Sequence, residues 1–492
     1  MTKKSQDKTL IASDSIFQIN QVDLRLLFEH SSDVHFHPLK LNNTEILLLY
    51  CAGMIEQNFL NEQIIPALDH FLQKNEVSSL KQESYLGTLH LSEVRYITSK
   101  DELITAIYTG YGLFHFKNDH SILSIKMENK PQRTPEETSM EVTIKGPRDN
   151  FIEDITVNMA LIRKRLPTNS LRSEQFTVGV RSKTAVQVVY IDDVVDKEIL
   201  VKVKKQIEKI EIDAIYSGFQ FMQLVENKLT LFPLHDYTGR PDFVVRSLIT
   251  GRIIILIDGI PYAIITPANF FLLLKSAEDL ENPPLASSFG RLIRILGIFL
   301  AAFAPGFWVA ITAFHPNQLP LTLLATVIQS RTGIPLSAAM EAMIMLLLFD
   351  LFREAGLRLP ISIGQTLSVV GGLIIGDAAI RAGLTSPSML VVIAASSVAT
   401  FTLVNQSLIG IVSLIRFFVL LLSSFFGFLG FFVSGFAIIL FLANIRAFGV
   451  PYLQLATRFN FLNAIKTILQ LPATINKKRS NMFDSKDPTR RK

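Results

Sequence analysis

The sequence predicts an α/β N-terminal region of two subdomains, facing the cytoplasm, followed by an α-helical polytopic membrane domain. The chain has 48 Lys and Arg and 43 Asp and Glu in 492 residues, but only 11 of these charged residues lie between Leu292 and Val450. Ahead of that segment, short apolar runs alternate with amphipathic helical patterns. Composition therefore excludes both a disordered chain and a purely soluble enzyme.

Five segments are expected along the chain. The first is polar and should form a flexible N-terminus without a secretory signal, because Met1 to Gln18 contains no apolar core. The segments are the N-terminus (1–40), a first α/β subdomain (41–135), a second α/β subdomain (136–280), a membrane domain (281–450) and a basic cytoplasmic tail (451–492).

Each α/β subdomain is predicted from apolar strand patterns and amphipathic helix patterns. In the second subdomain, Asp258-Gly259 is a strong hairpin signal between two apolar runs. The expected elements are strands at 46–52, 94–98, 122–126, 186–191, 252–257 and 262–265 and helices at 60–72 and 198–210.

The two subdomains resemble each other at an offset of 140 residues. Five apolar pairs match: Tyr50 with Tyr190, Met54 with Val194, Ile55 with Val195, Phe59 with Ile199 and Leu60 with Leu200. The match indicates either an internal repeat or the pattern that any two strand–helix units share.

Three stretches are apolar and long enough to cross a membrane, which takes about 20 residues. They are Leu292–Phe314, Ser388–Val412 and Phe417–Ala443. Two further stretches, 336–352 and the glycine-rich 363–380, contain acidic residues, and 319–328 is too short to cross. We therefore expect four to five crossings plus a re-entrant segment.

Basic residues suggest the orientation of these spans. Arg291 and Arg294 flank the first span and the tail is basic, so both termini should face the cytoplasm. An even number of crossings satisfies this, with 363–380 re-entrant and Arg416 in a connection on the outer side.

No motif for catalysis, a cofactor or a metal is present, so we expect neither an enzyme nor a bound cofactor. The single cysteine, Cys51, lies in an apolar run and is interpreted as a buried structural thiol. His35 and His37 would share one face of a strand, but no third metal ligand lies nearby. A net charge of +5 does not indicate nucleic-acid binding.

The membrane half contains the candidate functional residues. A carboxylate costs about 2.5–3.5 kcal/mol at the centre of a membrane helix, so Glu341 should face protein or water. Glu341 is either an ion-pathway group or a structural partner of an arginine such as Arg331. Asp350 lies beside Arg353 and Glu354 in an expected interfacial cluster.

Small residues at intervals of four form a stripe on the predicted 363–380 helix. The stripe permits close helix packing and, if identical helices meet around an axis, could line a narrow pore. Gln365 at its start is polar enough to face water. The pore or gating candidates are Glu341, Gly364, Gln365, Ser368, Gly372 and Gly376.

Several ordered motifs between about residues 40 and 450 resemble a known family. They include 146–154 (GPRDNFIED), 158–165 (NMALIRKR), 181–184 (RSKT), 240–242 (RPD), 258–261 (DGIP) and 356–360 (GLRLP), followed by 364–366 (GQT). Together they resemble the A subunits of GerA-type spore germinant receptors.

The resemblance implies a protein of the inner membrane of the bacterial endospore. Such A subunits work with a transporter-like B subunit and a lipoprotein C subunit, sense small nutrients that the partner could bind, and trigger germination. They are thought to form a ring with a central cation pore. Glu153, Asn158 and Arg163, polar positions of one motif, are candidates for bridging neighbouring subunits or subdomains.

Other function classes stay open on the sequence alone. The broken apolar segments and the isolated acid fit a secondary transporter, although no inverted repeat is visible. A non-conducting scaffold or signalling subunit fits as well. The sequence also does not distinguish a nutrient receptor subunit from a paralogue linked to dipicolinate release.

Overall fold

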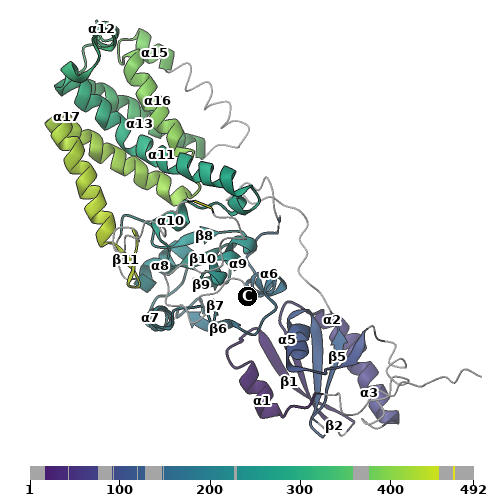
Figure 1. Cartoon of the computed structure of the whole chain (residues 1–492). Helices are drawn as coiled ribbons and strands as arrows, with labels where there is room; N and C mark the ends of the chain where they lie inside the picture. Colours follow the sequence, from purple (N-terminus) through teal and green to yellow (C-terminus); the bar gives the residue numbers. More distant parts are fainter. Residues whose placement is uncertain are drawn as a thin grey trace, which may run out of the picture. The chain divides into compact units, whose positions relative to one another are not determined.

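A computed structural model describes two compact units. The described residues are 17–42, 44–75, 91, 93–118, 120–127, 147, 149–226, 230–357, 376–453 and 469–470. Unit 1 contains two five-stranded sheets and is formed mainly by residues up to 228 with 237–267, and unit 2 is the helical part, 229–236 with 268–476. Figure 1 shows the sheets and the helices of each unit.

The first sheet has the strand order β1-β2-β4-β5-β3, with antiparallel pairing throughout. Its helices cover both faces. The elements are α1 (Gln21–Leu27), β1 (Val34–Leu41), β2 (Thr44–Cys51), α2 (Gln57–Phe59), the π-helical η2 (Leu60–Ile64), α3 (Ile65–Lys74), β3 (Val94–Tyr96), α5 (Lys100–Tyr108), β4 (Tyr111–Phe116) and β5 (Ile122–Lys126).

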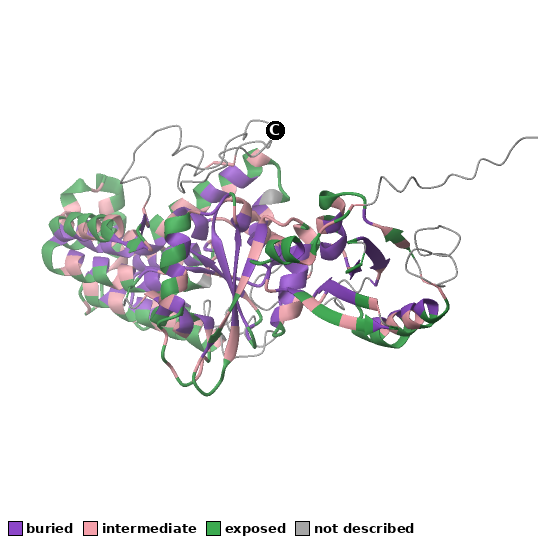
Figure 2. Cartoon of the chain, turned by 90° about the horizontal axis from the view of Figure 1, so that it is seen from below, coloured by how far each residue is buried: buried purple, intermediate pink, exposed green. Residues whose placement is uncertain are grey.

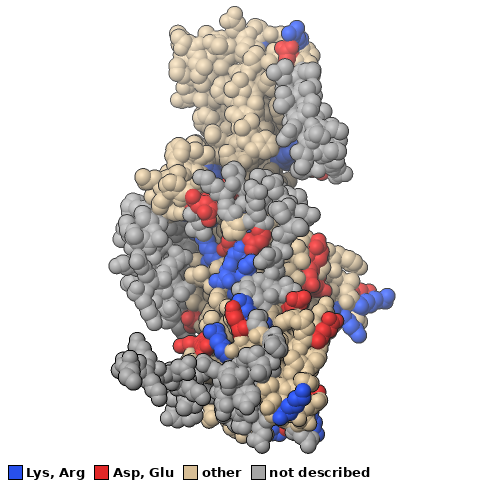
Figure 3. Space-filling view, turned by 90° about the vertical axis from the view of Figure 1, so that its right-hand side faces the viewer, with Lys and Arg blue, Asp and Glu red and all other residues tan. Residues whose placement is uncertain are grey.

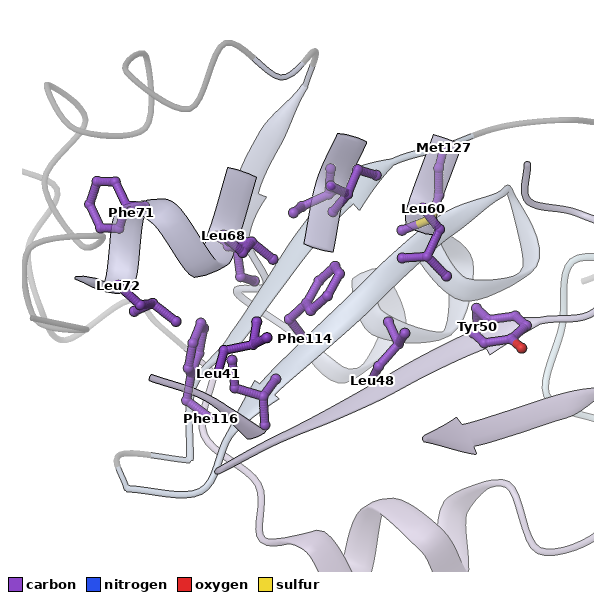
Figure 4. Close-up of a cluster of buried hydrophobic side chains, with 14 of the residues drawn as sticks. Leu41, Leu48, Tyr50, Leu60, Leu68, Phe71, Leu72, Phe114, Phe116 and Met127 are labelled. Carbon is purple, nitrogen blue, oxygen red and sulfur yellow. The ribbon is translucent and has the colours of Figure 1, made fainter. Parts of the chain in front are cut away.

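Alternate residues of β2 enter two different cores. Leu48 and Tyr50 pack with η2 and α3 on one face, a cluster drawn in Figure 4. Leu47 and Leu49 pack with α1 and α5 on the other face. Because both faces are covered, the strand reads as one continuous apolar run rather than an alternating one.

The second sheet has the order β6-β7-β9-β10-β8. Asp154 caps the helix that precedes it by accepting hydrogen bonds from the backbone of Thr156 and Val157. The elements are α6 (Ile155–Arg165), β6 (Leu171–Val178), β7 (Thr184–Ile191), α7 (Lys197–Ile207), α8 (Gly218–Glu226), β8 (Asp236–Thr238), α9 (Pro241–Ile249), β9 (Ile253–Ile257) and β10 (Ala263–Thr266).

The two sheets are structural repeats. Their strand orders are identical, and each strand of the second sheet begins 137 to 142 residues after its counterpart in the first. The residues matched at an offset of 140 lie in equivalent places: Tyr50 is near the end of β2 and Tyr190 near the end of β7, and both are buried. The repeat indicated by the sequence is therefore present.

The structure adds elements where the sequence predicts a flexible N-terminus. Within 1–40, the described residues 17–40 contain α1 and most of β1. Val34 is buried in the core, whereas His35, His37 and Pro38 are exposed on this edge strand. These residues interrupt the apolar pattern by which a strand is recognised in the sequence. Histidine and proline are tolerated here because an edge strand is partly exposed to solvent.

The larger part of the helical unit follows β10. Figure 2 shows that many of its helices are exposed on their outer faces. The elements are α10 (Phe270–Leu273), the 3-10 helix η5 (Ala277–Leu280), α11 (Pro284–Val309), the π-helical η6 (Ala310–Phe314), η7 (Pro316–Gln318), α12 (Leu321–Ser330), α13 (Ala338–Leu357), α15 (Gly376–Arg381), α16 (Pro387–Thr400), α17 (Gln406–Asn444) and the short strands β11 (Arg446–Ala447) and β12 (Val450–Pro451).

Two described helices are long and apolar enough to cross a membrane, Pro284–Phe314 and Ser407–Asn444. The span expected at Ser388–Val412 is not one helix, because α16 ends at Thr400 and Asn405 caps the start of α17. With 14 residues, α16 is about 21 Å long, shorter than a hydrocarbon core of about 30 Å. The total number of crossings stays a prediction.

A glycine bends α17 into the two limbs drawn in Figure 1. Gly427 has φ 58° and ψ −134°, a conformation that residues with a side chain rarely adopt. A Cβ at this position would lie 2.9 Å from Cβ of Phe314. The bend therefore depends on glycine both for backbone freedom and for space.

Substitution of this glycine should destabilise the helical unit. Gly427→Ala is expected to lower the free energy of unfolding by about 1–3 kcal/mol because of backbone strain. Gly410→Ala is the matched control in the same helix, since a Cβ there meets nothing within 4 Å. The check is denaturant unfolding of the full chain in micelles, followed by the fluorescence of Trp308. Equal stability of the two variants would contradict this role of Gly427.

Candidate functional site

Glu341 lies in the interior of the helical unit, on the first turn of α13, and its side chain is fully buried. Its Oε1 accepts hydrogen bonds from the backbone N–H of Ser386 (2.5 Å), from Ser386 Oγ (2.6 Å) and from Thr385 Oγ1 (3.1 Å). Ser386 is the N-cap of α16, so the carboxylate is placed where the helix dipole favours negative charge.

The second carboxylate oxygen of Glu341 faces a guanidinium group. Nε of Arg331, the residue that ends α12, lies 3.7 Å from Oε2. The pairing with Arg331 expected from the sequence is therefore present. Glu341 connects α13 with the end of α12 and the start of α16, and its role in an ion pathway stays a prediction.

A second charged cluster joins four helices. Nη2 of Arg416 in α17 donates to both carboxylate oxygens of Asp350 in α13, at 2.8 and 2.9 Å. Nη1 of Arg416 lies 3.3 Å from Oγ of Ser396 in α16, which itself donates to the carbonyl oxygen of Ala301 in α11. Arg353 is also 3.6 Å from Asp350.

The position of Arg416 corrects the sequence-based expectation. Arg416 was expected in a connection on the outer side, but it lies inside α17 with no exposed surface. Its partner Asp350 is 66 residues away, so no local spacing reveals the pair. The sequence does show one arginine within a long apolar run. Such an arginine needs a charge partner, which indicates that a pair exists.

Most of the predicted pore stripe lies outside the described residues: Gly364, Gln365, Ser368 and Gly372 are among 358–375. Gly376 is described and is the first residue of α15. It is buried, and a Cβ there would lie 3.3 Å from Cδ2 of Leu390 in α16. This glycine therefore serves close packing of α15 on α16.

Arg163 lies at a junction between the two α/β repeats, where α6 meets the segment before β1. Its Nε and Nη2 donate to Oδ2 (2.7 Å) and Oδ1 (3.0 Å) of Asp33, and both side chains are buried. The guanidinium also lies 3.9 Å over the ring of Tyr108. Within one chain, Arg163 therefore connects the two repeats.

Asn158 lies in the same helix as Arg163 and is buried as well. Asn158 is 1% exposed and uses its amide to accept from the backbone N–H of Ile152 and donate to the carbonyl oxygen of the same residue. A role of either residue between subunits stays a prediction. Glu153 is exposed and stays a candidate.

The surroundings of this junction shift the pKa values of its buried Tyr108, Cys51 and Arg163 side chains so that each keeps one protonation state. Burial raises the pKa of Tyr108 to about 12. Burial and the carboxylate of Asp33 raise the pKa of the Cys51 thiol, which donates to Asp33 Oδ2 at 3.4 Å. Burial opposes the charge of Arg163, but Asp33 and Tyr108 more than reverse this, so the pKa of Arg163 is raised overall.

Removal of the arginine should open this junction. Arg163→Met leaves Asp33 buried without its counter-charge, which costs about 3–5 kcal/mol. We expect an earlier unfolding midpoint and faster maleimide labelling of Cys51, the only cysteine in the chain. Arg181→Met is the control, because the Arg181–Asp213 pair is exposed. Unchanged labelling and stability in Arg163→Met would contradict the junction.

Comparison with known proteins covers the α/β repeats and the helical unit together. A family model described as Bacillus/Clostridium GerA spore germination protein matches residues 23–482. Spore germination protein XA of Bacillus anthracis is 40% identical over 483 residues, covering 96% of this chain and 98% of that protein. Spore germination protein KA of Bacillus subtilis (strain 168) is 30% identical, with coverage of 99% and 90%.

A solved structure, the N-terminal domain of the A subunit of the Bacillus megaterium spore germinant receptor GerK3, is similar with a TM-score of 0.41 and 24% identity, covering 52% of this chain and 98% of that one. The family match and the identity to the relatives extend over almost the whole chain. The chain therefore belongs to the GerA family of spore germination proteins.

Proposed function

We propose that this chain is the A subunit of a nutrient germinant receptor and acts as one subunit of an oligomeric, ligand-gated cation channel in the inner membrane of the endospore. A transporter-like B subunit and a lipoprotein C subunit are its partners. A nutrient, bound by the receptor, shifts the helical unit from a closed to an open state.

The observation that carries this proposal is the buried carboxylate of Glu341. An ionisable group within apolar helices is costly and is typical of an ion pathway or of a pairing that holds such a pathway in shape. Its Oε1 accepts three hydrogen bonds, whereas Oε2 has the Arg331 guanidinium 3.7 Å away as its charge partner. On the face drawn in Figure 3, the surrounding helical unit is almost free of charged side chains.

The proposal predicts a charge effect at Glu341. Glu341→Gln keeps an oxygen acceptor for Ser386 but removes the negative charge. Potassium release after addition of mixed L-amino acids, sugars and nucleosides should fall by about tenfold or more, because a unit charge a few Å from a cation contributes several kcal/mol at the effective dielectric of a protein. The measurement is potassium efflux from spores, with the amount of chain checked by immunoblot.

Asp377→Asn is the matched control, since Asp377 forms an exposed ion pair with Arg381. Normal efflux in Glu341→Gln spores would remove Glu341 from the ion pathway. Normal efflux together with an absence of ion current through the purified receptor would favour the scaffold alternative, and coupled uptake in proteoliposomes would favour a transporter.

A further inference from the structure

A fourth buried cluster lies at the start of α11, apart from the residues of the three clusters described above. Its centre is Asp279 in η5, a residue that is 3% exposed. Asp279 Oδ2 accepts from the backbone N–H of Ser276, and Ser276 Oγ accepts from the backbone of Glu278, which forms a capping box. The carboxylate is therefore held in place by its own turn.

Two guanidinium groups from α11 bind this carboxylate. Nε of Arg291 lies 2.9 Å from Oδ2, and Nη2 of Arg294 lies 3.0 Å from Oδ1. Nη1 of Arg294 also donates to the carbonyl oxygen of Leu274 at 2.9 Å. Burial alone would raise the pKa of Asp279, but Arg294 and Arg291 lower it overall, so the carboxylate is ionised at neutral pH.

The chain beyond the last long helix reaches the same place. Gln470 Nε2 donates to the carbonyl oxygen of Asp279 at 2.8 Å, and Gln470 Oε1 accepts from Nη2 of Arg291 at 2.8 Å. The backbone N–H of Gln470 donates to Ser288 Oγ at 2.9 Å. The turn at Asp279, the start of α11 and the sequence-distant Gln470 therefore share one set of hydrogen bonds.

The contacts use one face of α11. Ser287, Arg291 and Arg294 are spaced by four and three residues, so they lie on the same side of the helix. Ser287 Oγ donates to the carbonyl oxygen of Asp279 at 2.7 Å. The start of α11 is thus fixed in rotation as well as in position.

We propose that Asp279, Arg291, Arg294 and Gln470, here named the α11 joint, form the coupling element between the α/β half and the first long apolar helix. The chain runs from β10 through Asp279 into α11, so this segment is the covalent path between them. Because the joint fixes one face of α11 to that path, α11 cannot turn or tilt unless the path moves with it.

The contacts of Gln470 connect the α11 joint to a second part of the chain. Gln470 lies after α17, so the joint holds the start of α11 and the segment that follows α17 at one point. A displacement of Asp279 therefore reaches the start of α11 and the chain at Gln470, which follows α17 in the sequence. This inference rests on the proposed function, since it assumes that the helical unit changes state.

The test uses spores in which the native chain is replaced by variants. Asp279→Asn keeps the shape of the side chain and removes its charge, and Gln470→Ala removes the side-chain contacts of Gln470 with Asp279 and Arg291 but keeps its backbone contact with Ser288. Each should lower potassium efflux by about tenfold at a normal amount of chain, a typical size for coupling between sites. The double variant should release as much potassium as the single variant with the lower efflux, because the two residues act as one unit. Glu281→Gln, an exposed acid two residues further on, is the control.

Hydrogen exchange of the purified full chain provides a readout that is independent of nutrients. Amides at the start of α11 should exchange about tenfold faster in Asp279→Asn than in Glu281→Gln if the joint holds the helix. Normal efflux despite faster exchange would show that the joint is structural only and would overturn the proposal. Unchanged exchange would overturn it as well.

The outcomes separate the two proposals. If Asp279→Asn lowers the amount of chain, the result with Gln470→Ala decides, and normal efflux in that variant overturns the coupling role. If Glu341→Gln spores respond normally while Asp279→Asn and Gln470→Ala spores do not, the ion pathway is wrong and the joint stands. If unaltered spores release no potassium through this receptor, the proposed function fails, and hydrogen exchange alone then decides whether the joint holds α11.

Discussion

Buried pairing of aspartate with arginine is the interaction on which the arrangement of this chain depends. Asp33 with Arg163, Asp279 with Arg291 and Asp350 with Arg416 are each within hydrogen-bond distance, and in each pair the arginine is buried. The attraction repays the desolvation of both charges only when the geometry is good. Each pair therefore stabilises one arrangement of its segments and strongly disfavours the others.

The three pairs act at three different levels of the fold. Asp33–Arg163 joins two α/β repeats that have the same strand order, Asp279–Arg291 fixes the start of the first long apolar helix, and Asp350–Arg416 joins α13 to α17. Hydrophobic packing within each sheet and each helix pair is non-directional. The ion pairs are directional, so they select one relative position of the segments among those that packing alone would permit.

The sequence predicts the elements whose signal is local. The apolar runs at 46–52, 186–191 and 252–257 are the buried strands β2, β7 and β9, and Asp258-Gly259 forms the turn between β9 and β10. Strand β1 is missed because His35, His37 and Pro38 face solvent on an edge. The break between α16 and α17 is missed because Asn405, a polar cap, lies within an apolar run.

The candidate site is predictable only where the partners are close in sequence. Arg331 and Glu341 are separated by ten residues, and their pairing could be anticipated. Arg163 and Asp33 are 130 residues apart, and Asp350 and Arg416 are 66 apart, so their pairing follows only from the fold. A buried arginine needs a charge partner because an unpaired buried charge is costly. The fold decides which carboxylate becomes that partner.

A double-mutant cycle at Asp350 and Arg416 tests the central claim most directly. Unfolding of the full chain in micelles would be measured for Asp350→Leu, Arg416→Met and the double variant. Each single change should cost about 3–5 kcal/mol by leaving one charge unpaired, and the double variant should recover most of this loss because neither charge is then buried. A double variant whose loss equals the sum of the two single losses would contradict the claim that the pair holds α13 to α17.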